Sequence, residues 1–221
     1  MSNYQTFTAE AFPKMERFFR RYFMNSLSGF KSVNLVGTKS LTGQTNLAVF
    51  SQIFHIGATP PLMGVVVRPH TVERHTLENI LTTQSYTFNH IHESFYKQAH
   101  QTSARYPKET SEFEAVGLTE KYSDDPAITA PYVAESWVQI GLELAERHDL
   151  SINGTILLIG EVREVHVVPD IIEPDGYLDL EAAGSVTCTS LDTYHKTERL
   201  ARLSYAKPDR ELEEIPVSEK K

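Results

Sequence analysis

Cysteine is almost absent from this chain, and its scarcity excludes several classes of protein. Among 221 residues there is one cysteine, Cys188, which excludes an internal disulfide and a cysteine-based zinc cluster. No apolar run approaches the ~20 residues of a membrane-spanning helix, and the first residues lack the basic and apolar regions of a secretory signal. We therefore expect a cytoplasmic protein without membrane association, in which Cys188 is a small buried side chain.

Several catalytic motifs are also missing. The chain has no G-x-G-x-x-G after a strand, no G-x-x-x-x-G-K-[ST] and no G-x-S-x-G, so a Rossmann site, a P-loop and a serine-hydrolase elbow are unsupported. Nine histidines suggest a metal site, and His90 and His92 share one face of a strand. No H-E-x-x-H motif and no carboxylate at ligand spacing accompanies them. We therefore expect no metal.

Basic residues are fewer than acidic ones, at 21 against 29, and the formal net charge is -8. Nucleic-acid binding requires a basic face that neutralises phosphates, so we expect no nucleic-acid partner. A nucleotide ligand would need a locally positive pocket within this acidic protein. Residues 68–75 are one of the few segments that supply such charge.

The hydrophobic pattern favours a β core with helices at its periphery. Alternating or apolar runs bounded by turn signals predict strands, and Gly160 is predicted to mark a bulge or bend. One domain over residues 1–206, with an N-terminal helix, and a charged flexible tail over 207–221 are expected. The predicted strands span 30–37, 47–56, 62–67, 86–91, 136–143, 155–168 and 185–190, and the predicted helices span 8–25, 92–105, 111–117 and 197–206.

A candidate anion site follows the apolar strand at 62–67. Arg68 and Arg74 bracket a loop, and Thr76 is the predicted N-cap of the next helix. The free N–H groups and the dipole of a helix start favour an anion, and arginine bonds two phosphate oxygens at once. An ordinary capped surface helix with solvated arginines is the commoner explanation of these features taken alone.

Two further patterns leave alternatives open, and a third predicts a helix start. The aromatic stripe in 8–25 suits a membrane, a partner or the protein's own sheet, and packing on the domain or on a second subunit is expected. Thr102 and Ser103 either bond a cofactor or satisfy a helix end. Ser111 and Glu114 have capping-box spacing.

The order of the pieces between residues 45 and 89 resembles the flavin reductase-like family of FMN-binding split barrels. The matching pieces are NLAVFSQIF at 46–54, PPL at 60–62, RHTLENI at 74–80 and YTFN at 86–89. The likeness extends from about residue 30 to residue 195. It implies a mainly β fold, a Greek-key split β-barrel with peripheral helices.

The resemblance also implies ligands and contact residues. FMN is the implied cofactor, NADH or NADPH the implied hydride donor, and a homodimer with flavin near the subunit interface the implied assembly. Thr102 and Ser103 are further candidates, and His75 replaces the aspartate of many relatives, which leaves the phosphate ligands open. The implied flavin contacts are Asn46, Ala48, Phe50, Ser51 and Gln52, and the implied phosphate contacts are Arg68, Arg74, Thr76 and Asn79.

The implied enzyme is an FMN-dependent NAD(P)H oxidoreductase that transfers hydride from nicotinamide to flavin N5. Because the flavin carries this chemistry, no catalytic side chain is predicted; His55 and His195 are guesses for a proton donor. A flavin-binding carrier or sensor with the same binding residues is the alternative. A barrel that has lost flavin is disfavoured, because Arg68 and Thr76 are present.

Overall fold

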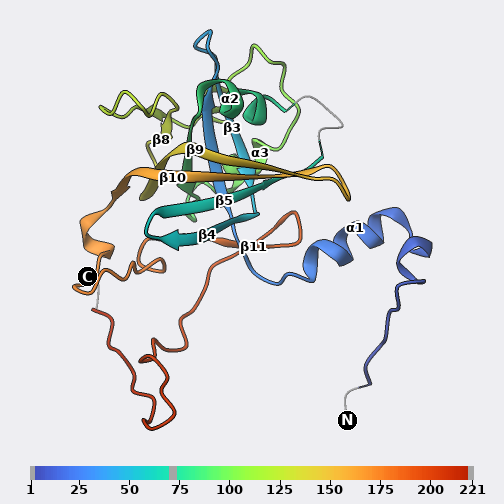
Figure 1. Cartoon of the computed structure of the whole chain (residues 1–221), viewed down its shortest axis with the longest axis vertical. Helices are drawn as coiled ribbons and strands as arrows, with labels where there is room; N and C mark the ends of the chain where they lie inside the picture. The colour runs from blue at the N-terminus through green and yellow to red at the C-terminus, as the bar shows by residue number, and fades with distance from the viewer. Residues whose placement is uncertain (1–2, 70–73, 219–221) are drawn as a thin grey trace.

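A single antiparallel sheet of seven strands dominates the computed structural model, which describes residues 3–69 and 74–218. Its strand order is β3-β2-β6-β9-β10-β5-β4 (Figure 1). The prediction of a mainly β protein is therefore confirmed. The strands are β2 (Asn34–Lys39), β3 (Thr45–Phe50), β4 (Ile53–Ala58), β5 (Pro61–Val67), β6 (Ser85–His90), β9 (Val138–Leu150) and β10 (Thr155–Val167).

The sheet curls, so that β4, at one end of the strand order, contacts β1, the short strand that precedes β2 in the chain. The hydroxyl of Ser32, in β1 (Lys31–Ser32), donates a hydrogen bond to the Ile53 carbonyl of β4 at 2.5 Å. Strand β1 also pairs with β11 (Thr187–Thr189), which pairs with β12 (Thr193–His195). A two-stranded ribbon of β7 (Glu120–Lys121) and β8 (Tyr132–Val133) lies to one side. Strands β1, β7, β8 and β12 are too short for periodicity to predict.

Two apolar cores lie on the two faces of the sheet. Inside the curl, Tyr86 and Phe88 of β6 pack with Leu142 and Leu158. On the other face, Leu47 and Phe113 belong to a second core that also contains Cys188, whose predicted burial is confirmed. Alternate residues of β2 serve the two cores, as a two-residue strand period requires. The helices of the second face are α3 (Tyr96–Gln101) and α4 (Glu112–Val116).

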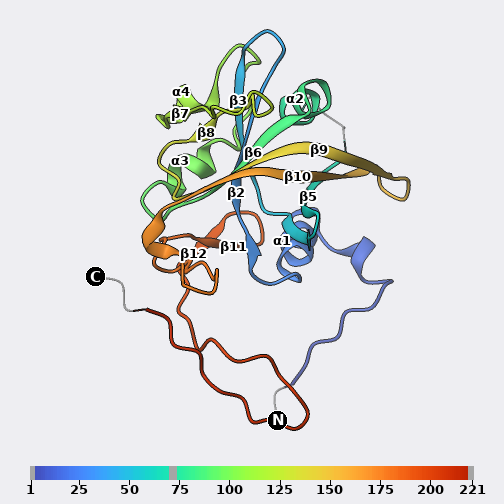
Figure 2. The ribbon, with the colours of Figure 1, turned by 60° about the vertical axis from the view of Figure 1, so that its left-hand side comes forward.

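The N-terminal helix is shorter than predicted and covers no core. A 3-10 turn at Phe12–Lys14 precedes α1 (Arg17–Ser26), which starts where the Glu16 carboxylate accepts hydrogen bonds from the N–H groups of Phe18 and Phe19. No residue of α1 is buried, and the helix lies at the lower edge of the barrel (Figures 1 and 2). The expectation that its aromatic stripe packs on its own domain is therefore wrong; a second subunit remains.

Several predicted boundaries are corrected by local contacts. The run at 47–56 divides into β3 and β4 at Ser51 and Gln52, where the chain turns and the Gln52 carbonyl accepts from Val66 N–H. The helix at 92–105 contracts to α3, because His92 bridges to Ser185 instead. Ser111 makes no cap bond, since its hydroxyl pairs with that of Thr45 at 2.7 Å, so the capping box is wrong.

Strands β9 and β10 form one long hairpin around a turn at Asn153 and Gly154. The pairing shifts register between Ile159 and Gly160, which confirms the predicted bulge. A Cβ atom on Gly160 would lie 2.0 Å from the Tyr86 hydroxyl. Glycine is therefore required there because a buried ring occupies the space.

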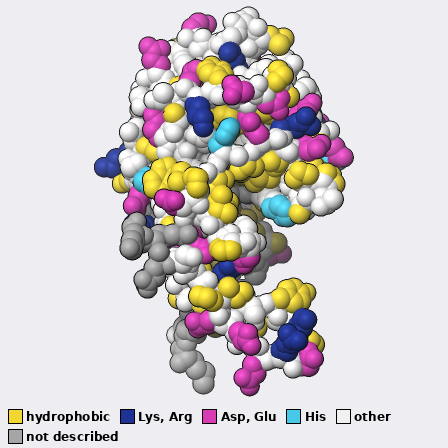
Figure 3. All heavy atoms as spheres, turned by 90° about the vertical axis from the view of Figure 1, so that its left-hand side faces the viewer, with side chains coloured by type: hydrophobic (Ala, Val, Ile, Leu, Met, Phe, Trp, Pro, Cys, Tyr) yellow, Lys and Arg dark blue, Asp and Glu magenta, His cyan; other side chains and the backbone are white. Residues whose placement is uncertain are grey.

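The C-terminal segment forms an extended arm instead of the helix predicted at 197–206. Leu203 bridges to Glu214, Arg202 is paired with Asp175, and the Ile215 N–H donates to the Arg202 carbonyl. Figure 3 shows this arm and the N-terminal segment as a lower lobe, below a band of hydrophobic side chains on the main body. Within the described ranges, no helix has the length and apolar content to cross a membrane.

Candidate functional site

One large cavity, of about 1240 Å³, lies where several elements meet. Its walls come from β3 and the following bend, the end of β5, the start of α2 (His75–Thr83), the end of α3, and α1. All the sequence-predicted site residues except Asn79 line it: Asn46, Ala48, Phe50, Ser51, Gln52, Arg68, Arg74, Thr76, Thr102 and Ser103.

Asn46 and Thr76 join β3 to the start of α2. The Asn46 amide donates a hydrogen bond to the Thr76 hydroxyl at 2.9 Å, and both side chains are buried. Arg74 holds the N-cap position and makes no side-chain cap bond. Thr76 is thus a residue of the first turn, and its predicted role as N-cap is wrong because its oxygen serves Asn46. Thr76 lines the cavity.

Strand β3 ends the sheet, so one of its edges has no neighbouring strand. On that edge the Leu47 N–H donates to the carboxylate of Glu112 at 2.9 Å. Burial raises the pKa of Glu112, and its hydrogen bond with Leu47 opposes this shift. Because successive N–H groups alternate in direction along a strand, the Val49 N–H lies on the same outer edge. Val49 lines the cavity, which therefore has a backbone donor along one wall.

Three guanidinium groups gather at one end of the cavity: those of Arg21, Arg68 and Arg74. The pKa of Arg68 is lowered by burial and by the charges of Arg21 and Arg74. Arg74 donates from two nitrogens to the Pro69 carbonyl, at 3.2 and 3.3 Å, and so fastens the backbone that precedes it. No described carboxylate forms an ion pair with any of these three arginines. The described residues therefore make this end of the cavity cationic within an acidic protein.

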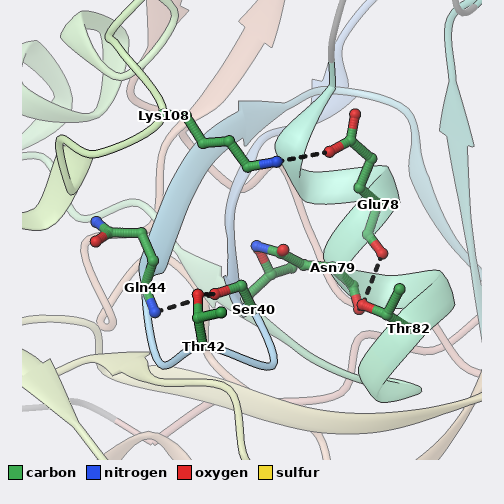
Figure 4. A network of polar contacts seen from close by, with 8 residues as sticks. Ser40, Thr42, Gln44, Glu78, Asn79, Thr82 and Lys108 are labelled. Atoms are coloured by element: carbon green, nitrogen blue, oxygen red, sulfur yellow. Dashed lines mark hydrogen bonds and ion pairs between the residues drawn. The ribbon is translucent and has the colours of Figure 1, made fainter.

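Asn79 lies in a different place. Its amide donates to the Thr38 hydroxyl of β2 at 3.1 Å, which ties α2 to the sheet. It lines a second cavity of about 240 Å³, whose polar rim is seen in Figure 4. There the Gln44 N–H donates to Ser40, and Lys108 pairs with Glu78 at 3.4 Å (Figure 4). Nothing in this arrangement brings Asn79 to the cationic end.

The end of α3 brings residues to the cavity that the sequence alone did not indicate. His100 Nδ1 lies 3.1 Å from the Tyr194 hydroxyl, and burial raises the pKa of Tyr194 to about 12. Thr102 donates to the Ala99 carbonyl at 2.7 Å, so it satisfies a helix end while facing the cavity. His195 instead contacts Thr189 Oγ1, at 2.9 Å.

The two histidines guessed as proton donors do not line the cavity; His100 does. No sequence motif marked His100 as a cavity residue, since Tyr194, which it approaches, is 94 positions away. Across residues 3–69 and 74–218, no group of three or more His, Cys, Asp or Glu side chains is placed to hold a metal ion.

Comparison with known proteins adds a family and a fold. Residues 29–183 match the model of the Flavin reductase like domain. An uncharacterized protein from Halalkalibacterium halodurans is 30% identical over 174 residues, which cover 75% of this chain and 81% of that one.

Solved structures extend the comparison. A protein from Shewanella frigidimarina NCIMB 400, assigned as a flavin reductase with a split barrel domain, is 48% identical with a TM-score of 0.87, covering 91% of this chain and 100% of that one. Nitrilotriacetate monooxygenase component B from Bacillus cereus is 22% identical with a TM-score of 0.81 over 92% and 100%; this likeness concerns the fold alone. The predicted split barrel is confirmed.

Proposed function

Because this chain belongs to the flavin reductase-like family, we propose that it is an FMN-dependent oxidoreductase that takes hydride from NADH or NADPH. The observation that carries this proposal is the composition of the large cavity. It combines apolar side chains, a strand edge with a backbone donor, and a cationic end. FMN has three parts that such a cavity suits: a flat ring, a hydroxylated chain and a phosphate.

The residues that line the cavity fit these three parts chemically. Phe50, Val66 and Leu77 offer apolar surface to the ring, and the Val49 N–H offers a donor to its polar edge. Asn46, Ser51 and Gln52 offer amides and a hydroxyl suited to the ribityl chain, and Arg68, Arg74 and Thr76 offer donors suited to a phosphate. Asn79 is left out of the proposed site, because its amide is bonded to Thr38.

The size of the cavity supports a second ligand beside the flavin. Pockets for single small molecules typically measure about 300–1,000 Å³, and this cavity measures about 1240 Å³. The surplus leaves room for a nicotinamide ring against the flavin. Holding two reactants in contact replaces a bimolecular encounter by an oriented step, which is the main contribution a protein makes to hydride transfer.

Bound flavin would supply the redox chemistry by accepting hydride at N5. The chain's own residues would bind the phosphate, shape the slot for the ring and exclude water. Tyr194 is protonated at neutral pH, as an ordinary tyrosine is and as its raised pKa requires, and its hydroxyl lies in hydrogen-bond contact with His100 at the cavity wall. Protonated Tyr194 thus supplies polarity without a charge.

The test is a visible absorbance titration of the purified chain with FMN, followed by NADH or NADPH under anaerobic conditions. We expect a perturbed, protein-bound flavin spectrum that bleaches with one or both nucleotides. Bound FMN that both nucleotides leave oxidised would replace this proposal with the carrier or sensor function. Failure to bind FMN, with FAD titrated in parallel, would contradict FMN as the cofactor.

A further inference from the structure

Helix α1 reaches the large cavity although packing does not hold it there. Arg21, Tyr22 and Asn25 line the cavity, while no residue of the helix is buried. Residues four apart lie on the same face of a helix, so Arg21 and Asn25 face the cavity together. A hydrogen bond between Asn25 and Arg68 joins α1 to the barrel at the cationic end.

Asn25 fixes the position of a barrel arginine. Its side-chain oxygen accepts a hydrogen bond from Arg68 Nη2 at 2.9 Å, and its amide nitrogen donates to the Arg21 carbonyl at 2.7 Å. Lys31 donates to the Asn25 backbone carbonyl at 3.2 Å. The Asn25 side chain is therefore bonded at both its oxygen and its nitrogen, and its oxygen accepts from one nitrogen of the Arg68 guanidinium.

The charges at this end are left without a counter-charge by the described residues. Arg74 is engaged with the Pro69 carbonyl, whereas Arg21 and Arg68 form no ion pair with a described carboxylate. Like charges at close range repel, as the lowered pKa of Arg68 reflects. Such a cluster is stable when a dianion joins it. Two convergent guanidinium groups present the donor geometry that phosphate oxygens accept.

We propose that Arg21 and Arg68 form a binding subsite for a phosphate monoester. Helix α1 supplies Arg21, and Asn25 of the same helix positions Arg68. This subsite rests on the proposed function for its ligand. Two terminal phosphates have the required chemistry, the 5′-phosphate of FMN and the 2′-phosphate of NADPH. Both carry about two negative charges near pH 7, as phosphate monoesters do.

The test compares Arg21→Gln with Arg17→Gln. Arg17 lies one turn earlier on the same helix and outside the cavity, with its guanidinium 6.0 Å from the Phe18 ring. Both variants remove one charge, so the comparison cancels the change in net charge. Two ligand pairs differ by one phosphate each: FMN against riboflavin, measured as Kd, and NADPH against NADH, measured as KM.

Arg21→Gln should raise the Kd or KM of one phosphorylated ligand by about 10–100-fold, as the loss of a charged hydrogen bond does. The same constant for the ligand without that phosphate should change less than twofold. A change in the FMN pair identifies the flavin phosphate, and a change in the NADPH pair identifies the donor phosphate. The proposal is overturned when Arg21→Gln matches Arg17→Gln for both pairs, or when both members of a pair weaken equally.

A second variant tests the positioning role of Asn25. Asn25→Ala should weaken the same phosphorylated ligand, and it should add little to Arg68→Gln, because both changes remove one guanidinium from its place. Full additivity would overturn that role. Turnover of the unmodified chain with NADH and NADPH tests the proposed function separately, since it does not depend on which residues bind the phosphate.

Discussion

The hydroxyl group of Tyr86 lies in the barrel interior without a hydrogen-bond partner in the part of the chain that the structure describes. The residue is completely buried, and burial raises the pKa of this hydroxyl. A buried polar group without a partner costs its full desolvation free energy, about 1–3 kcal/mol. Gly160 leaves room for the hydroxyl and offers it no side-chain partner.

Replacing Tyr86 by phenylalanine should therefore stabilise the protein by about 1–2 kcal/mol, measured as the free energy of unfolding in urea. The ring and its packing stay, and only the unsatisfied oxygen is removed. Tyr132→Phe is the matched control, because the Tyr132 hydroxyl donates to Glu164 at 2.7 Å and its loss should destabilise. Equal losses in both variants would show that the Tyr86 hydroxyl has a partner.

Glu112 gives a second residue-scale prediction, in the pH dependence of stability. Its pKa is raised in the folded state, so above the ordinary value of 4.5 the folded state holds its proton more tightly than the unfolded chain does. The contribution is therefore most favourable below 4.5 and is lost as the pH rises through the folded-state pKa. Glu112→Gln should remove this loss and keep an oxygen that accepts from Leu47.

The check is the melting temperature of Glu112→Gln and of the parent chain at pH 4 and pH 8. We expect the variant to gain stability relative to the parent at pH 8, with a smaller difference at pH 4. Glu114→Gln, on the exposed side of the same helix, should show neither effect. A variant less stable than the parent at pH 8 would mean that the charge of Glu112 stabilises the fold.

At the scale of the elements, Asn79 fastens α2 to the sheet through Thr38. Asn79→Ala should lower the free energy of unfolding by about 1–3 kcal/mol, since it leaves a buried hydroxyl without its donor. It should leave the FMN Kd of the folded protein within twofold, because Asn79 lies outside the large cavity. A loss of FMN affinity comparable with that of Arg68→Gln would contradict this prediction and indicate that Asn79 contacts the phosphate.

How far the sequence predicts these elements depends on the range of the forces that set them. Alternation and turn residues placed β5, β6 and the bulge at Gly160, because strand period and glycine conformation are local. The helix predicted at 197–206 failed, since pairing with residues 213–215 decides that segment. Thr76 looked like an N-cap, and its actual partner, Asn46, is thirty positions away.

The residues of the site also divide into those that a local motif predicts and those that only tertiary contacts bring to the cavity. The motif-bearing residues of β3 line the cavity, as Arg74 and Thr76 do at the start of α2, whereas Asn79 does not. Arg21 and His100 also line it and were not among the predicted site residues. A helical arginine normally reads as a solvated charge, and nothing in the chain before folding says that α1 turns its polar face to the end of β5. Only the tertiary arrangement brings Arg21 to Arg68.

At the scale of the whole molecule, the chain exposes more surface than a compact monomer. Its accessible area is 13805 Å², whereas a compact chain of 25.0 kDa exposes about 10,200 Å². Part of the excess is apolar: Phe18 and Phe19 of α1 are 57% and 52% exposed, and Tyr205 of the arm is 89% exposed. Obligate dimers bury about 2,000–5,000 Å² over both partners together, so pairing with a second copy would cover part of this excess on each chain.

We therefore predict a homodimer, with twice the chain mass of 25.0 kDa by light scattering during size-exclusion chromatography. Phe18→Asp with Phe19→Asp should favour the monomer, because charges on the exposed face of α1 oppose burial. The pair Arg17→Gln and Arg21→Gln, on the same helix, is the control for altered charge. A parent chain that elutes as a monomer at micromolar concentration would contradict the prediction.

Truncation after Ala206 tests the role of the arm. The described residues that line the cavity extend no further along the chain than Tyr194, so the truncated chain should bind FMN with a Kd within twofold of the parent, by absorbance titration. Abolished binding would make the tail part of the site or of the assembly that completes it.

The edge of β3 that pairs with no described strand has a consequence for solubility. An edge strand with free N–H groups is a template on which another chain adds a strand, the first step of many aggregates. Glu112 accepts a hydrogen bond from the Leu47 N–H, and Glu120 accepts one from the Thr45 hydroxyl at 2.6 Å. Two carboxylates therefore stand along the row that an incoming strand would use. We therefore expect the wall that shapes the ligand cavity also to hinder strand addition from a second molecule.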